Sequence, residues 1–131
     1  MNKALPIAVS VCLTGLACSG DRDLPAAYRQ IAIPSGLGSD GAIRRGERLY
    51  QSNCALCHGV RLDGRGVRQT GFTEPPRNFT DETWQQATSP RRLFFTIREG
   101  IAGTAMPAWR TFDMAETWDL VAYVRARSAT R

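Results

Sequence analysis

Histidine and lysine are the least frequent residue types in this sequence, and their scarcity helps to exclude some classes of function. Its 131 residues include one histidine, His58, and one lysine, Lys3, against 16 arginines. A single histidine excludes a metal centre built from several imidazoles, such as the three-histidine catalytic zinc site. The formal net charge is +5, but no run of basic residues is longer than two and no nucleic-acid-binding motif occurs. The sequence therefore argues against nucleic acid as a partner.

The sequence also lacks a hydrophobic run long enough for a permanent membrane helix. Its apolar stretch over residues 4–16 is shorter than the about 20 residues that such a helix needs. A short apolar stretch that follows a basic residue and ends in small residues is typical of a secretory signal. We therefore predict an export signal over residues 1–17.

Cys18 directly follows this leader and offers a site for a lipid. Together with it, the preceding residues read L-T-G-L-A-C, which is similar to a lipoprotein signal whose new N-terminal cysteine receives acyl chains. Cleavage before Cys18 would remove Cys12 and leave Cys54 and Cys57 for other chemistry. The alternative is ordinary cleavage near Ala17 with an unmodified Cys18. Of the two, we predict the lipid anchor.

Residues 54–58 read C-A-L-C-H, which is the attachment pattern of haem c. Two thiols two residues apart can form thioethers with the vinyl groups on one porphyrin edge, and the following histidine can bind the iron. A zinc site and a thioredoxin-type redox pair are the alternatives. A structural zinc site needs four protein ligands, and a thioredoxin motif follows a strand, which residues 51–53 do not resemble. We predict one covalent haem c on Cys54, Cys57 and His58.

Met106, in the segment G-T-A-M-P-A-W, is the expected second ligand of the iron. A methionine thioether is a soft ligand, and its pairing with histidine raises the reduction potential. Pro107 disfavours the helical conformation for the residue before it, as suits a loop that presents a side chain to iron. Met114 is the competing methionine, but it lies at the predicted start of the last helix. A Met106 that only fills a gap in the core is the other alternative.

Two long helices are predicted near the ends of the mature chain. The first covers residues 41–53, with Ser39 or Asp40 as its cap, and carries apolar residues on one face. The second covers residues 114–127 and follows a D-M-A-E capping box at residues 113–116.

Shorter helices are predicted between these two. One covers residues 81–87, with Thr80 as its cap. Another is capped by Ser89, has Pro90 in its first turn and ends at Gly100. No strand alternation and no repeat occurs, so the fold class is all-α. Residues 18–39 contain prolines and glycines without a sustained apolar period and are predicted to form a tether before a domain of residues 40–131.

The sequence resembles a class I cytochrome c of the bacterial type, with one haem and histidine–methionine ligation. The motifs that carry the resemblance over residues 42–124 are G-E-R-L-Y at 46–50, C-A-L-C-H-G at 54–59, D-G-R-G at 63–66, P-P at 75–76, I-R-E-G at 97–100, M-P-A-W at 106–109 and L-V-A-Y-V at 120–124. The resemblance implies a small cytochrome c fold whose helices pack around one covalent haem. It also implies that the first and last helices cross beside the haem at Gly46. Finally, it implies that the carbonyl of Pro75 or Pro76 binds the second ring nitrogen of His58.

The resemblance further implies a one-electron carrier in a periplasmic respiratory chain, not an enzyme on its own. Two protein ligands, His58 and Met106, leave the iron no open position for a substrate. The expected partners are redox proteins that donate and accept electrons, together with the membrane through Cys18. The protein is expected to be a monomer or a subunit of a respiratory complex. Two alternatives stay open: a fixed haem c subunit of a dehydrogenase, oxidase or reductase, and a gas-binding or peroxide-reducing haem protein.

Overall fold

Helices and loops make up the part of the chain that the computed structural model describes, which is residues 21–68 and 70–127. No strand occurs in this part, and the predicted all-α class is confirmed. In chain order the helices are α1 (Ala26–Arg29), α2 (Asp40–Asn53), α3 (Ala55–His58), α4 (Glu82–Ala87), α5 (Pro90–Glu99) and α6 (Met114–Arg127). None of these helices is long and apolar enough to cross a membrane. The predicted leader and Cys18 lie outside the described residues.

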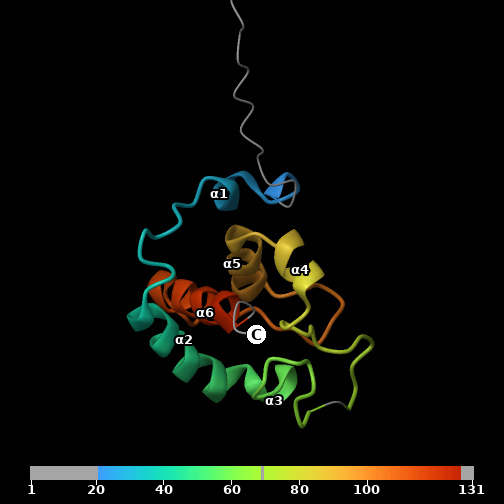
Figure 1. Ribbon diagram of the computed structural model, residues 1–131. Coiled ribbons are helices and arrows are strands. Elements are labelled where there is room, and N and C mark those ends of the chain that lie inside the picture. Colours follow the sequence, from blue (N-terminus) through green and yellow to red (C-terminus); the bar gives the residue numbers. More distant parts are fainter. Residues whose placement is uncertain (1–20, 69, 128–131) are drawn as a thin grey trace, which may run out of the picture.

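The two long helices, α2 and α6, pack against each other (Figure 1). Their closest approach is at Gly46. A Cβ atom at this position would overlap the backbone carbonyl of Asp119 and lie 2.9 Å from Cβ of Tyr123. Beside the crossing, the rings of Tyr50 and Tyr123 pack with their centroids 5.2 Å apart. Arg45 reaches over to the carboxylate of Asp119 through two hydrogen bonds of 2.7 and 2.9 Å. The close approach that the resemblance implied for Gly46 is therefore present.

Both long helices begin as their sequences predict. The side chain of Ser39 accepts a hydrogen bond from the amide of Ala42 and caps α2. Asp113 accepts from the amide of Glu116 at 2.8 Å, and the Glu116 carboxylate accepts from the amide of Asp113 at 2.9 Å. This reciprocal pair satisfies two amides that have no partner inside α6.

One of the two predicted caps of the shorter helices is confirmed and the other is wrong. Ser89 caps α5, with its hydroxyl accepting from the amide of Arg92 at 3.0 Å. Asp81, not Thr80, caps α4, because its carboxylate accepts from the amide of Trp84. The hydroxyl of Thr80 donates instead to the side chain of Asn78 at 2.7 Å, so it belongs to the turn before the helix.

The buried core is formed largely by α5 and α6, with Tyr50 of α2, Ala55 of α3 and the loop residues Leu62 and Phe79 packed into it. The apolar face of α5 consists of Leu93, Phe94 and Ile97, all of them buried. The ring of Phe94 lies 4.4 Å from that of Trp118 on α6, measured between centroids. Apolar contact of this kind is what holds a helix as short as α5 in place.

The N-terminal segment, residues 21–31, differs from the expected tether because it is attached to α5. Leu24 in this segment is 3% exposed, and the ring of Tyr28 packs edge-on against Phe95 with centroids 4.8 Å apart. One short helical turn, α1, lies within this segment. Few apolar residues make this attachment, so hydrophobic periodicity does not reveal it. Figure 1 shows α1 lying next to α5, away from α3.

We expect Gly46→Ala to lower the free energy of unfolding by about 3 kcal/mol, because the new methyl group must push α2 away from α6. The measurement is chemical denaturation followed by circular dichroism. Gly41→Ala in the same helix is the matched control, since its Cβ would lie 3.3 Å from the flexible end of Arg45. The control should be neutral or slightly stabilising, because alanine favours helix over glycine by about 1 kcal/mol. Equal effects of the two substitutions would contradict the crossing.

Candidate haem site

The residues of the C-x-x-C-H motif lie within a single helical turn. Cys54 directly follows α2, its amide donates to the carbonyl of Tyr50 at 2.8 Å, and α3 begins at the next residue. The amides of Cys57 and His58 both donate to the carbonyl of Cys54, at 3.2 and 2.9 Å. Both cysteines are free and partly buried. The fold thus holds two thiols and one imidazole together on the segment that follows α2.

The imidazole of His58 is oriented by two contacts from the loop before α4. Nδ1 lies 3.0 Å from the carbonyl oxygen of Arg77, and the ring stacks on Phe79 with centroids 4.5 Å apart. A carbonyl can only accept, so the proton of the neutral ring lies on Nδ1 and the lone pair of Nε2 is free for a metal ion. A second-nitrogen hydrogen bond of this kind is what histidine ligands of metals usually have.

The prediction that the carbonyl of Pro75 or Pro76 accepts this hydrogen bond is wrong. The acceptor is the carbonyl of Arg77, the residue after Pro76. The Pro76 carbonyl faces Gly64 instead, where a Cβ atom would lie only 2.6 Å from its oxygen. That contact sets the register of the loop, so the next carbonyl, that of Arg77, faces the imidazole.

The protonation of His58 and Cys54 distinguishes between the proposed chemistries. Burial lowers the pKa of His58, against the opposing effect of its hydrogen bond to the Arg77 carbonyl, so the ring is neutral near pH 7 as a ligand must be. Burial, with a smaller contribution from Cys57, raises the pKa of Cys54 to about 12. The attacking cysteine of a thioredoxin-type pair has a lowered pKa. In addition, residues 51–53 are helical, whereas a thioredoxin-type motif follows a strand.

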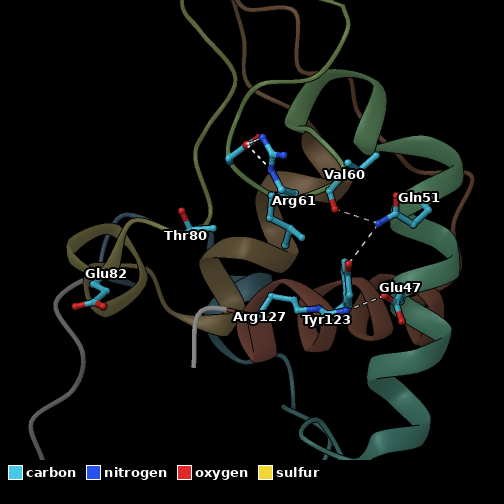
Figure 2. Close-up of a pocket in the computed structure, with 10 residues that line it drawn as sticks. Glu47, Gln51, Val60, Arg61, Thr80, Glu82, Tyr123 and Arg127 are labelled. Carbon is cyan, nitrogen blue, oxygen red and sulfur yellow. Dashed lines mark hydrogen bonds and ion pairs between the residues drawn. The ribbon is translucent and has the colours of Figure 1, made fainter. Parts of the chain in front are cut away.

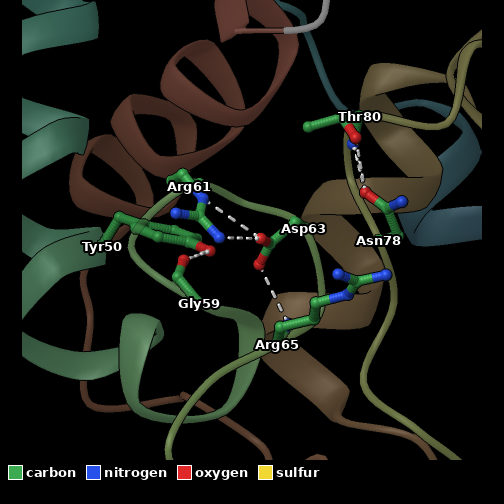
Figure 3. A network of polar contacts seen from close by, with 7 residues as sticks. All are labelled: Tyr50, Gly59, Arg61, Asp63, Arg65, Asn78 and Thr80. Carbon is green, nitrogen blue, oxygen red and sulfur yellow. Dashed lines mark hydrogen bonds and ion pairs between the residues drawn. The ribbon is translucent and has the colours of Figure 1, made fainter.

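A polar network folds the loop after His58 back onto the helices (Figure 3). The hydroxyl of Tyr50 donates to the carbonyl of Gly59 at 2.8 Å. The carboxylate of Asp63 accepts from the amide of Arg65 and from the guanidinium of Arg61. These donors, the Arg65 amide foremost, hold the pKa of Asp63 below its usual range. The loop therefore has a defined path beside the imidazole.

Met106 lies in the methionine loop, which we define as residues 101–113 between α5 and α6. The backbone at Met106 is not helical, as Pro107 predicted, and the side chain is partly buried. Its carbonyl accepts from the amide of Ile101 at 3.1 Å. Met114, by contrast, begins α6 and is 47% exposed. These contacts define the path of the loop, while the pairing of Met106 with His58 on one iron stays a prediction.

A separate pocket of about 550 Å³ lies beside the α2–α6 crossing (Figure 2). Glu47 and Arg127 form an ion pair at 2.9 Å on its wall, and the amide of Gln51 donates to the hydroxyl of Tyr123. None of the predicted haem-site residues lines this pocket. Across the described residues, no group of three or more histidine, cysteine, aspartate or glutamate side chains is arranged to hold a metal ion.

Comparison with known proteins identifies the family. Residues 41–124 match the family described as cytochrome c oxidase, cbb3-type, subunit III. The chain belongs to this cytochrome c family. Membership implies a covalently bound haem c, in agreement with the two free thiols and the oriented imidazole.

The relatives include two cbb3-type cytochrome c oxidase subunits. Subunit FixP of Azorhizobium caulinodans is 33% identical over 72 residues, which are 55% of this chain and 22% of that protein. Subunit CcoP of Azospirillum sp. (strain B510) is 32% identical over 93 residues, which are 69% of this chain and 30% of that protein. The chain thus spans less than a third of the length of these relatives. A chain of the reducing HAO-like protein complex of Kuenenia stuttgartiensis shares the fold, with a TM-score of 0.58 and 21% identity over 74% of this chain and 45% of that chain.

Two contributors to the site were missed by sequence reasoning. The carbonyl of Arg77 is a backbone group, which no residue type reveals. Phe79 is buried under the imidazole, and only its position three residues after the proline pair could have suggested that contact.

We expect Gly64→Ala to disturb the hydrogen bond between His58 and Arg77, because the new methyl group would displace the Pro76 carbonyl. The measurement is the Nδ1–H proton resonance of His58 by NMR, which should broaden or shift. Gly71→Ala is the matched control: both glycines have positive φ, but nothing lies within 4 Å of a Cβ at Gly71. Both variants bear the cost of about 1–2 kcal/mol for alanine in that conformation. An unchanged resonance in Gly64→Ala would contradict the orienting role of this loop.

Proposed function

We propose that this chain is a one-electron carrier domain with one haem c attached to Cys54 and Cys57 and with His58 and Met106 as iron ligands. The observation that carries the proposal is the single turn in which two free thiols lie beside an imidazole whose Nδ1 is bound to a carbonyl. Membership of the cytochrome c family supports it. The bound haem c would supply an iron that alternates between two oxidation states.

The residues of the chain have two tasks in this function. The first is to hold the ligands still: Arg77 and Phe79 orient His58, and hydrogen bonds to α5 hold the loop of Met106. Ligands that stay in place in both oxidation states keep the reorganisation on electron transfer small. The second task is to supply two protein ligands, His58 and Met106, which would leave the iron no open position for a substrate. For this reason we propose a carrier and not a catalytic centre.

Within that function, we favour electron transfer to a membrane-bound terminal oxidase, with the chain either a subunit of the oxidase or its electron donor. The match to cbb3-type subunit III, and the names of the relatives, support this choice over a carrier for an unrelated pathway. The two forms differ in stoichiometry. A subunit co-purifies with larger chains at a fixed ratio in mild detergent, whereas a free carrier elutes alone.

We also propose that the domain lies on the periplasmic side of a bacterial membrane, with residues 1–17 as a signal and a lipid on Cys18. The attachment of residues 21–31 to α5 changes what such an anchor would do. Asp21 bonds the hydroxyl of Ser89 and pairs with Arg91 at 3.8 Å. The three residue steps from Cys18 to Asp21 reach about 11 Å at most. The anchor would therefore hold the start of α5 near the bilayer instead of on a long tether.

Cys54→Ala and Cys57→Ala should each strongly reduce covalent haem, because each substitution removes one thioether. Intact-mass spectrometry of the wild-type protein should show one added haem and no free thiol at Cys54 or Cys57. Alanine at Ser52, an exposed residue of α2, is the control and should leave the haem content unchanged. Isolation of a native protein that binds zinc and no haem would refute the proposal.

Met106→Ala should keep its covalent haem, lose the weak charge-transfer band of a methionine–ferric iron bond and have a lower reduction potential. Met114→Ala is the matched control, and its band should persist because Met114 is exposed on α6. The measurements are the visible spectrum and redox titration. A wild-type protein without the band, whose reduced form readily binds carbon monoxide, would favour the gas-binding alternative.

Cys18→Ser should release the protein from the membrane fraction into the soluble periplasmic fraction, with its visible spectrum unchanged. Stable anchoring needs more than one acyl chain, each buried methylene contributing about 0.8 kcal/mol, so the lipidated protein should resist salt washing and need detergent for release. Wild-type protein that is soluble after lysis, with an unmodified N-terminus near Cys18, would exclude the anchor and leave the haem proposal standing.

A further inference from the structure

The carboxylate of Glu99 joins two segments that lie far apart in the sequence. Glu99 is the last residue of α5. One of its oxygens accepts a hydrogen bond from the hydroxyl of Tyr28 in α1, and the other accepts from the guanidinium of Arg110 in the methionine loop. Tyr28 precedes Glu99 by 71 positions. A single side chain thus connects the N-terminal segment with the loop that carries Met106.

The two donors counter an unfavourable position of the Glu99 charge. A carboxylate at the C-terminal end of a helix lies next to the negative end of the helix dipole, which disfavours its charge. Even so, the hydrogen bond from Tyr28, followed by that from Arg110, holds the pKa of Glu99 below its usual range. The carboxylate is therefore ionised at neutral pH, and hydrogen bonds to a charged acceptor are stronger than those between neutral groups.

The same end of α5 supports the methionine loop along its length. The amide of Trp109 donates to the carbonyl of Ile97 at 2.9 Å, and Arg98 donates to the carbonyl of Phe112 at 2.8 Å. A Cβ atom on Gly100 would lie 2.7 Å from the carbonyl oxygen of Met106, so the loop packs directly on the helix end. Any group that fixes Glu99 therefore acts close to the backbone of Met106.

The hydroxyl of Tyr28 is presented to Glu99 by a segment that is attached independently. Asp23 pairs with Arg92, and Arg91 donates to the carbonyl of Ile31 at 2.9 Å. The ring of Tyr28 itself contacts the rings of Phe95 and Phe94, at centroid distances of 4.8 and 6.3 Å. Loss of the hydroxyl alone would leave these contacts in place.

We propose that Tyr28 is a positioning residue of the methionine loop, which it stabilises against α5 through Glu99 and Arg110. This inference rests on the proposed ligation of iron by Met106. Tyr28 lies outside residues 41–124, the part of the chain that matches the family. By this contact the N-terminal segment would influence how readily Met106 leaves the iron.

The test compares the haem-loaded wild-type chain with Tyr28→Phe, which removes the hydroxyl and keeps the ring. The first measurement is hydrogen exchange at the amides of Ile101 and Trp109, which bond the carbonyls of Met106 and Ile97. We expect exchange at both to become about fivefold faster, since a hydrogen bond to a charged group is lost. Amides in the middle of α6 should keep their wild-type rates, because they report on global unfolding.

The second measurement uses added imidazole, which competes with the thioether for the sixth position on the iron. In Tyr28→Phe, the imidazole concentration that removes half of the methionine charge-transfer band should fall by about fivefold, by the same reasoning. If Tyr28 had only a general structural role, Tyr28→Phe would also change the stability of α6. A change in this imidazole concentration with no change in α6 is therefore what the proposal predicts.

Two further variants distinguish the proposed path, from Tyr28 through Glu99 and Arg110 to the methionine loop, from a loss of the attachment of the N-terminal segment to α5. Asp23→Asn removes an ion pair between the N-terminal segment and α5 without touching Glu99, and both readouts should stay at wild-type values. In a Glu99→Ala background, Tyr28→Phe should add no further change, because its path to the loop is already broken.

The proposal is overturned if Tyr28→Phe leaves both readouts unchanged, if Asp23→Asn alters them equally, or if the effects of Tyr28→Phe and Glu99→Ala add. A wild-type protein with no methionine band would instead refute the ligation by Met106. The exchange rates of Ile101 and Trp109 would still decide whether Tyr28 holds the loop.

Discussion

The contact of α2 with α6 at Gly46 is the constraint on which the rest of the site depends. Only glycine allows the backbone carbonyl of Asp119 to lie against α2, and this approach brings the two helices close enough to bury Tyr50 and Tyr123. A buried carboxylate is costly unless it is paired, and Arg45 supplies the partner of Asp119 with two hydrogen bonds. The crossing therefore combines backbone contact, aromatic packing and one ion pair within about two helical turns.

The position of the haem motif follows from this crossing. The last turn of α2 continues through Cys54 into α3, so the direction of α2 determines where both thiols and the imidazole lie. Tyr50 connects the two regions: its ring contacts Tyr123 at the crossing, and its hydroxyl holds the carbonyl of Gly59 just after His58. A change at the crossing would thus reach the proposed iron ligand through one rigid side chain and one helical turn.

The predictions that succeeded from sequence were those that depend on local chemistry. Ser39 and the pair Asp113–Glu116 satisfy the free amides of their own helices, so a few adjacent residues determine those boundaries. The predictions that failed both concern the loop before α4. Asp81, not Thr80, caps α4, and the carbonyl of Arg77, not that of a proline, accepts from His58. Packing of the loop before α4 on Gly64 decides which carbonyl faces His58, and this contact lies outside any local pattern. The ligand roles of Cys54, Cys57, His58 and Met106 stay predictions.

Attachment of the N-terminal segment bears on how the proposed carrier would meet its partners. Leu24 and the ring of Tyr28 supply its apolar contacts, whereas an exposed ion pair such as that of Asp23 with Arg92 contributes about 0–1 kcal/mol and weakens in salt. The apolar contacts should therefore keep the segment in place at physiological ionic strength. If Cys18 carries the proposed lipid, a domain attached in this way would lack the reach of a long flexible tether. Such an anchor would suit a partner held at a fixed place in the same membrane, and it would support the oxidase-subunit form of the proposed function over a carrier that travels between distant complexes.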